Sequence, residues 1–312
     1  MLRTRYLCNF ASLLERNEEL RKQRLLEIYS SYNSLSNHEQ TKKVYSGEFW
    51  MEATKIFCGT ELPLVNSNYL KELDLLSKAV VPQLVSDGTV WKHFGLSNTH
   101  HSTSIEGNTL SEKDIGALFD SFGSYSSEQL MGMTQQDFRA VLHRNVTKRE
   151  CLEVLFHVNA FQLGKKEREL GNVVDFMEST YRLVPMRVRG SATVRPYPQE
   201  VPAIMQSYFD WFHSNREKVD SGAIHPVLFS ILAHCKFLHI HPFHDGNGRT
   251  ARLLMNLILN RYGLFGITVH KESRAKYMEL LEEHQQGHVE PLHNFLVLQT
   301  IQTIQEMNAK QN

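Results

Sequence analysis

Residues 225–263 read HPVLFSILAHCKFLHIHPFHDGNGRTARLLMNLILNRYG, and this stretch decides the fold. A histidine and a proline open it in a way that is typical of a helix start, and Val227 to Leu238 then follow with apolar residues at helical spacing. From Thr250 onward apolar residues recur nearly all round, which predicts a central, buried helix, and Gly263 suits the position just after its end. The sequence therefore predicts two helices joined by a short loop that contains glycines.

Helical periodicity dominates the rest of the chain as well. The segments Asn68–Leu84 and Val201–Phe212 repeat apolar residues at helical spacing. Ser111, followed three residues later by an aspartate, has the form of a capping box at a helix start. We therefore predict a mainly α protein of the all-α class, with a helical N-terminal region over residues 1–85 and a helical core domain over residues 86–312.

The composition excludes several classes of protein. The 312 residues carry 34 lysines and arginines against 34 aspartates and glutamates, so the chain has no global electrostatic attraction to nucleic acid or to an anionic membrane. The four cysteines lie far apart without a C-x-x-C pair, which argues against a disulfide framework and against a zinc knuckle. We expect neither nucleic acid nor a membrane as a partner.

Hydropathy and the N-terminal residues predict a cytoplasmic location. No stretch has the roughly 18 consecutive apolar residues that a membrane-spanning helix needs, and the N-terminus lacks the unbroken apolar run of a secretory signal. Arg3 and Arg5 precede the first acidic residue, Glu15, which makes a mitochondrial address the alternative.

The loop between the two predicted helices has the features of a phosphate-binding site. Two glycines in the DGNGR run at residues 245–249 let the backbone approach a ligand closely, and successive N–H groups at a helix N-terminus attract anions. Arg249 and Arg252 follow one turn apart and suit a polyphosphate. Asp245 offers a hard oxygen ligand to Mg²⁺, and His241 can accept a proton from an attacking hydroxyl.

An ordinary turn is the alternative interpretation of this loop. The dipeptides D-G and N-G are common in turns, and the chain lacks the G-x-x-x-x-G-K-[ST] pattern of a Walker loop. The joint pattern H-x-F-x-[DE]-G-N-G-R-x-x-R, however, is satisfied in full by residues 241–252. With each residue type at about 5% usage, a chance match in the chain is on the order of 10⁻⁸. The joint pattern therefore favours function.

With this pattern the chain resembles the Fic family of protein-modifying enzymes, over roughly residues 95–305. The resemblance implies a helical bundle with a catalytic loop at residues 241–252, ATP as the nucleotide and Mg²⁺ as the cofactor. The implied catalytic and ATP-binding roles are a base at His241, a magnesium ligand at Asp245, contacts to the α- and β-phosphates at Gly246, Asn247 and Gly248, contacts to the β- and γ-phosphates at Arg249 and Arg252, and a loop anchor at Phe243.

Gly248 determines which reaction the resemblance implies. The branch of the family that transfers phosphate has a lysine at this position and binds ATP in reverse. A glycine leaves room for the whole triphosphate, so that the attack falls on the α-phosphorus. The resemblance therefore implies a protein adenylyltransferase, which moves AMP from ATP to a hydroxyl side chain of a target protein (AMPylation).

A second motif, STSIEGN at residues 102–108, matches the inhibitory motif of the family, [ST]-x-x-x-E-[GN]. The resemblance implies an inhibitory helix near residues 98–108. The implied regulatory residues are Ser102, Glu106 and Gly107. On a helix Ser102 and Glu106 share a face, and a carboxylate paired with Arg252 would occupy the guanidinium that the γ-phosphate requires. A helix cap beside a surface glutamate is the alternative interpretation.

Two further assignments concern recognition of the target protein and of the adenine base of ATP. Residues 186–196 alternate around a Gly-Ser pair, which predicts a small β-hairpin. The family has a flap here that clamps the target chain by β-augmentation, which implies a target contact at Val194. The segment around Tyr277 resembles the adenine pocket, so this ring is expected to stack on the base. Where related animal enzymes have an asparagine, this chain has His284, which we assign to the ATP site.

The resemblance also implies partners. The animal members act on an ATP-driven heat-shock chaperone, and the same site can remove AMP, with Glu106 positioning a water. We therefore expect ATP and a protein substrate as partners, with a heat-shock chaperone as the implied target. The charged face of residues 15–25 is either solvated or the surface of a homodimer.

Two rival functions stay open at this point. One is a catalytically silent Fic scaffold that senses nucleotide and binds a partner protein, although the intact His241, Asp245 and Arg252 argue against it. The other is metal-dependent hydrolysis by the histidines of residues 239–244. Their spacing is not the i, i+4 pair of a helical metal site and no carboxylate triad accompanies them, so we do not expect a transition metal there.

Overall fold

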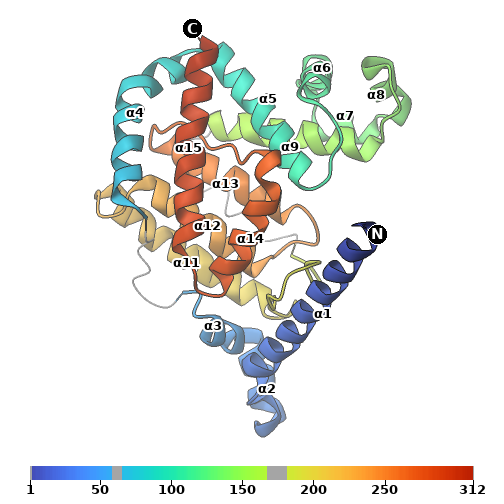
Figure 1. Cartoon of the computed structure of the whole chain (residues 1–312), viewed down its shortest axis with the longest axis vertical. Coiled ribbons are helices and arrows are strands. Elements are labelled where there is room, and N and C mark those ends of the chain that lie inside the picture. Colours follow the sequence, from blue (N-terminus) through green and yellow to red (C-terminus); the bar gives the residue numbers. More distant parts are fainter. Residues whose placement is uncertain (1, 58–64, 167–180, 312) are drawn as a thin grey trace.

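The computed structural model describes residues 2–57, 65–166 and 181–311, and every regular element in these residues is a helix. Figure 1 shows the arrangement. The α-helices are α1 (Leu2–Tyr29), α2 (Asn37–Ser46), α3 (Glu48–Thr54), α4 (Ser67–Ser86), α5 (Gly88–Ile105), α6 (Glu112–Phe122), α7 (Ser127–Gly132), α8 (Gln135–Leu142), α9 (Lys148–Lys166), α11 (Val201–Asp220), α12 (Pro226–Ile240), α13 (Asn247–Arg261), α14 (Arg274–Gln285) and α15 (Glu290–Gln311). Short 3₁₀ turns cover Tyr32–Ser34 and Lys271–Ser273.

The predicted pair of helices is the centre of the molecule. α12 and α13 pack against each other in the middle of the view in Figure 1, with α15 running along one side. Nδ1 of His225 accepts a hydrogen bond from the Val227 amide, 3.2 Å, so the predicted start of α12 is confirmed. Gly263, with φ +70°, follows the last turn of α13 as predicted, because glycine adopts the left-handed conformation without strain.

Two hydrophobic clusters hold the helices together. The larger contains buried side chains of α4, α5, α11, α12, α13 and α15. The smaller lies under α6, α7 and α8 and takes its other side from the first half of α9. Capping boxes at Ser111, Ser126 and Thr134 begin these three short helices, and the first of them was predicted. α9 also contributes Phe161 to the larger cluster, so one helix joins both.

The N-terminal helices dock onto the core through specific contacts. α1 lies at one edge of the molecule, with α2 and α3 beside its C-terminal end (Figure 1). The Tyr29 hydroxyl donates to Oε2 of Glu200, 2.6 Å, and the Trp50 indole donates to the Val194 carbonyl, 3.0 Å. α4 packs along α15. A division of the chain at residue 85 stays a prediction.

The segment predicted to be a β-hairpin is extended but carries no strand pairing in residues 181–200. A turn closes where the Ser191 amide donates to the Val188 carbonyl, 3.2 Å, with Gly190 at φ +79°. Beyond the turn, the Ala192 amide donates to Glu282 of α14, 2.7 Å, instead of to a facing strand. The hairpin prediction is therefore wrong in its pairing, because a carboxylate from another helix satisfies the backbone. We call residues 186–196 the flap segment.

Within the described ranges, none of the helices is both long and apolar enough to cross a bilayer.

Candidate active site

A pocket of about 200 Å³ opens beside the loop between α12 and α13. Its walls come from the end of α5, the flap segment, the loop itself with the start of α13, and one face of α14. The lining residues are Glu106, Val188, Ser191, Arg195, Leu238, His241, His244, Asp245, Gly246, Asn247, Gly248, Arg252, Tyr277, Met278, Leu281, Glu282 and Gln285. The two sequence motifs, which are far apart along the chain, therefore face one space.

His241 lies at the C-terminal end of α12 in a left-handed conformation, with φ +55°. Its Nδ1 lies 3.3 Å from the Leu238 carbonyl oxygen, which can only accept, so Nδ1 carries the proton and Nε2 has a free lone pair. Burial, helped by the charge of Arg195, lowers the pKa of His241 to about 3. The imidazole is therefore neutral at pH 7 and can accept a proton.

Two arginines that the sequence analysis missed hold the backbone around His241. Arg182 donates from Nε to the His241 carbonyl, 2.9 Å, and from Nη1 to the Val184 carbonyl, 3.1 Å. Arg195 donates from Nη1 to the carbonyls of Leu238, 2.9 Å, and His239, 3.1 Å. Both guanidiniums thus donate to carbonyls at the C-terminal end of α12 that need a partner outside the helix, and both join this end to the flap segment. Nothing local in the sequence marks either arginine.

The catalytic loop is closed by the side chain of Asn247. Its Oδ1 accepts from the Phe243 amide, 2.9 Å, and its Nδ2 donates to the Phe243 carbonyl, 2.8 Å. Gly246, at φ +83°, turns the chain into α13, which therefore begins at Asn247 and not near the predicted Thr250. Gly246, Asn247 and Gly248 at this helix start line the pocket, and the amides of a first helical turn, which have no partner within the helix, attract anions such as phosphate.

Arg252 meets the second motif in the interior. The guanidinium, whose side chain is 4% exposed, donates from Nη2 to Oε1 of Glu106, 2.7 Å, and from Nε to the hydroxyl of Ser102, 2.9 Å. Nη2 also donates to the Ser102 carbonyl, 2.8 Å. Gly107, at φ +101°, turns the chain just after Glu106, which ends α5. A charged contact between a buried guanidinium and a partly exposed carboxylate therefore joins the predicted inhibitory helix to the predicted catalytic loop.

A buried histidine completes this contact. Nε2 of His157 lies 3.1 Å from the Ser102 hydroxyl, and Nδ1 lies 3.0 Å from the Thr99 hydroxyl. Ser102 accepts from Nε of Arg252, and the same hydroxyl shares a hydrogen bond with Nε2 of His157. Burial, with the charges of Arg252 and Arg249, lowers the pKa of His157 to about 3. No motif marks His157 in the sequence, and its only signal is a polar side chain among the apolar positions of α9.

Asp245 lies at the mouth of the pocket between two arginines. Oδ2 is 3.0 Å from Nη2 of Arg149, and Oδ1 is 3.2 Å from Nη2 of Arg249, which also contacts Glu153 through Nη1 at 2.7 Å. Burial opposes ionisation, but the Gly246 amide and both arginines hold the pKa of Asp245 below its usual value. The carboxylate is 60% exposed beside the α13 start, which suits Mg²⁺ held by one carboxylate and phosphate oxygens.

The residues assigned to recognition of the adenine base and of the target protein do not all lie where they were expected. The Tyr277 ring lines the pocket but is 1% exposed, and its hydroxyl lies 2.7 Å from Nε2 of His234. His284 is outside the lining, and the next residue, Gln285, faces the pocket instead. Val194 is buried at 6% exposure beside Trp50, so its side chain points into the protein and offers no target contact in this arrangement. His284 misses the pocket because it lies one residue before Gln285 on α14. Val194 is buried because α3 docks beside it.

Comparison with known proteins identifies the family. Residues 151–259 match the Fic/DOC family. The chain is 31% identical over 299 residues to a protein adenylyltransferase Fic of Drosophila willistoni, which covers 89% of this chain and 57% of that protein. It is 26% identical over 298 residues to the enzyme of the same name from Aedes aegypti, with 89% and 58% covered. The chain thus spans a little over half the length of these curated relatives.

Solved structures agree on the fold. A Fic-domain-containing signaling protein from Bacteroides thetaiotaomicron superposes with a TM-score of 0.60 at 23% identity, covering 79% of this chain and 97% of that one. Fic-1 from C. elegans superposes with a TM-score of 0.58 at 20% identity, covering 96% and 87%. Since the motif at residues 241–252 lies within the matched stretch and closes a pocket on a Fic-like helical bundle, the chain carries a domain of the Fic/DOC family.

Proposed function

We propose that this protein transfers AMP from ATP to a hydroxyl side chain of a target protein. The observation that carries the proposal is the state of His241, whose Nδ1 bonds to the Leu238 carbonyl while the unprotonated Nε2 belongs to a residue that lines the pocket. A neutral imidazole fixed in one tautomer is what a general base requires. The names of the relatives, protein adenylyltransferase Fic, support the same reaction.

In the proposed reaction Nε2 of His241 takes the proton of the target hydroxyl, and the hydroxyl oxygen attacks the α-phosphorus of ATP. A new P–O bond forms, the bond between the α- and β-phosphates breaks, and pyrophosphate leaves with the electron pair. The amides at the start of α13 and the guanidinium of Arg252 stabilise the phosphate charge. Asp245 would hold Mg²⁺, which neutralises phosphate oxygens when it is bound.

We further propose that Glu106 inhibits this reaction. Its carboxylate engages Nη2 of Arg252 at 2.7 Å and lies against Gly248, where a Cβ would overlap Oε1. Both places are ones that the polyphosphate would occupy. A carboxylate there competes with the γ-phosphate for the same donors, so ATP binds productively only when Glu106 moves. The same carboxylate could position a water for the removal of AMP from a modified target.

Labelled ATP tests the proposal. Wild type, Glu106→Gly, Glu106→Gly/His241→Ala and the control Glu106→Gly/His213→Ala are incubated with Mg²⁺ and ATP carrying label on the α- or the γ-phosphate. An ATP-driven heat-shock chaperone, the target that the resemblance implies, is the first acceptor to add. We expect an AMP adduct by intact mass and α-label only, strongest in Glu106→Gly, kept in the His213 control and lost with His241→Ala.

Other outcomes separate the rival functions. Transfer of the γ-label would contradict AMP transfer and indicate a reversed nucleotide. ATP binding without any adduct would favour the silent scaffold, and loss of AMP from a pre-modified target would identify the reverse reaction.

A further inference from the structure

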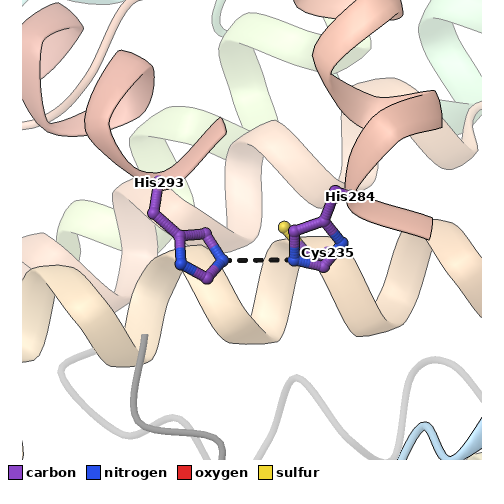
Figure 2. A group of neighbouring side chains, drawn as sticks. All are labelled: Cys235, His284 and His293. Atoms are coloured by element: carbon purple, nitrogen blue, oxygen red, sulfur yellow. Dashed lines mark hydrogen bonds between the residues drawn. The ribbon is translucent and has the colours of Figure 1, made fainter. Parts of the chain in front are cut away.

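Outside the pocket, three side chains with metal-binding atoms meet between α12, α14 and α15. Cys235 lies on α12, His284 near the end of α14 and His293 near the start of α15 (Figure 2). One ligand atom of each lies within 4.8 Å of the others, and the two Nε2 atoms are 3.1 Å apart. Figure 2 shows both imidazole rings turned toward each other, with the sulfur behind the His284 ring. The cluster brings one thiol and two imidazoles to a common point.

We propose that Cys235, His284 and His293 form a binding site for a thiophilic divalent cation, with Zn²⁺ as the first candidate. One thiolate and two imidazole nitrogens are a donor set that selects zinc and its congeners over Mg²⁺ or Ca²⁺. A separation of 3.1 Å between the two Nε2 atoms, with all three donors within 4.8 Å of one another, fits a single ion with bonds of about 2.0–2.3 Å after small side-chain rotations. A fourth position is left to a water, since the cluster has three members within the described part of the chain.

The burial of these side chains favours a binding site over a chance grouping of residues on the surface. Cys235 and His293 are 3% and 1% exposed, whereas His284 is only partly buried and gives the ion a route of entry. Nδ1 of the neighbouring His234 lies 3.7 Å from Sγ of Cys235, within reach of a weak hydrogen bond that would orient a thiolate. Metal-binding side chains held by such outer contacts are pre-arranged for the ion.

Electrostatics makes the cysteine the decisive ligand. Lys236 follows Cys235 in sequence, and its positive charge acts on His284. A dication placed there is repelled unless a negative ligand accompanies it. Binding must therefore release the thiol proton of Cys235 to solvent, which leaves a thiolate on the ion. Loss of Cys235 should remove binding altogether, while loss of one histidine should weaken it.

The bound ion would affect the pocket through the two helices that supply both its ligands and part of the pocket wall. α12 ends at Ile240, directly before His241, and α14 carries Tyr277, Leu281 and Glu282 into the lining. An ion shared by Cys235 and His284 would tie these two walls together. The proposal concerns this chain's own side chains and does not depend on AMP transfer.

A second group with metal-binding atoms, His101, His270 and Glu272, serves as an internal comparison. It is the weaker candidate because Nδ1 of His101 already accepts from the Lys271 amide, 3.1 Å, and no thiol is present. The two groups predict different signatures, since only a thiolate produces sulfur-to-metal charge transfer.

Cobalt titration of the untagged full chain tests the proposal. The protein is freed of metal with a chelator, kept reduced, and titrated with Co²⁺ while absorption is recorded, and bound zinc is then counted by elemental analysis after dialysis. We expect one ion per chain, a thiolate-to-cobalt charge-transfer band, and displacement of cobalt by zinc. Cys235→Ser should abolish the band, and His293→Gln should weaken binding by about tenfold or more.

Cys151→Ser is the matched control, because Cys151 is the other buried cysteine that is in no disulfide in the described part of the chain, and it should leave the band intact. Circular dichroism and thermal melting check that each variant folds. If Cys235→Ser fails to fold, zinc protection of Cys235 from alkylation in the wild type, mapped by mass spectrometry, gives the same answer. A folded wild type that binds no ion, or a band that survives Cys235→Ser, would overturn the proposal, as would loss of binding in His101→Gln.

Discussion

Oε1 of Glu106 lies so close to the backbone of Gly248 that a Cβ at that glycine would overlap it, while the same oxygen accepts from Nη2 of Arg252 at 2.7 Å. One carboxylate thus covers the first turn of α13 and a guanidinium together. Both are positive features that attract phosphate, the first through its free amides and dipole. A side chain at residue 248 would therefore displace the Glu106 carboxylate even before any nucleotide binds.

Removal of this carboxylate should raise the affinity for Mg-ATP. A hydrogen bond to a charged group contributes about 1.5–3 kcal/mol, so we expect Glu106→Gly to bind ATP roughly tenfold to a hundredfold more tightly than wild type. Glu106→Gln keeps the shape without the charge and should fall between them. Isothermal titration calorimetry measures the three affinities. Equal affinities would mean that Arg252 is not withheld from the nucleotide.

The overlap at Gly248 predicts coupling between two substitutions. Gly248→Ala in the wild type must push Glu106 away from Arg252, whereas in Glu106→Gly the space is empty. Urea unfolding of wild type, both single variants and the double variant forms a cycle in which neighbours in contact usually couple by 0.5–3 kcal/mol. We expect a coupling of about 1 kcal/mol, with alanine better tolerated in the Glu106→Gly background. Additive effects would mean that Glu106 does not contact Gly248 in solution.

Acid should destabilise the fold through buried neutral histidines. His157 has a pKa of about 3 in the folded protein against 6.5 when exposed, so the unfolded chain binds its proton first. Stability is retained above pH 6.5 and falls as the pH drops from 6.5 toward 3. Between pH 7 and pH 5 this one residue contributes a loss of about 2 kcal/mol.

The variant His157→Gln isolates this contribution. It should be less stable at pH 7, because Ser102 and Thr99 lose a partner, yet its stability should change less between pH 7 and pH 5. Urea unfolding at both pH values measures the difference. His213→Gln, at an exposed position, is the control and should keep the wild-type slope. An unchanged slope in His157→Gln would show that the residue is not buried as a neutral base.

Arg182 should act on the reaction by positioning His241. Arg182→Lys keeps the charge but loses the fork that reaches three carbonyls at once. If AMP transfer occurs as proposed, we expect transfer to fall about 10–100-fold while ATP affinity changes less than about twofold. Single-turnover transfer and calorimetry separate the two. Arg187→Lys, an exposed salt-bridge arginine of the flap segment, is the control. A parallel loss of ATP binding would indicate a general loss of structure instead.

Features that depend on neighbouring residues were predictable. The capping box at Ser111, the start of α12 at Pro226 and the glycine after α13 follow from hydrogen bonds and backbone preferences within about one turn. The start of α13 was predicted near Thr250 but lies at Asn247, because the Asn247 side chain bonds to Phe243 and Gly246 turns into the helix. These hydrogen bonds are local as well, but the spacing of apolar residues does not reveal them.

Features that depend on distant contacts were not predictable in the same way. The flap segment alternates like a hairpin, yet its Ala192 amide is satisfied by Glu282, 90 residues later. His284 and Gln285 are adjacent on α14, and only the packing of that helix determines which one faces the pocket.

The sequence by itself determined the helical class, the pair of helices around the loop and the identity of the loop residues. Capping and periodicity act over a few residues, and the loop residues stand in one continuous pattern. Only the tertiary structure decided that Arg182 and His157 support the site and that Val194 is buried. It also decided that Glu106 reaches Arg252, a contact that the motif had only implied. The physical reason is that these side chains meet their partners across 55 to 150 residues of chain, where burial and hydrogen bonding are set by packing and not by spacing.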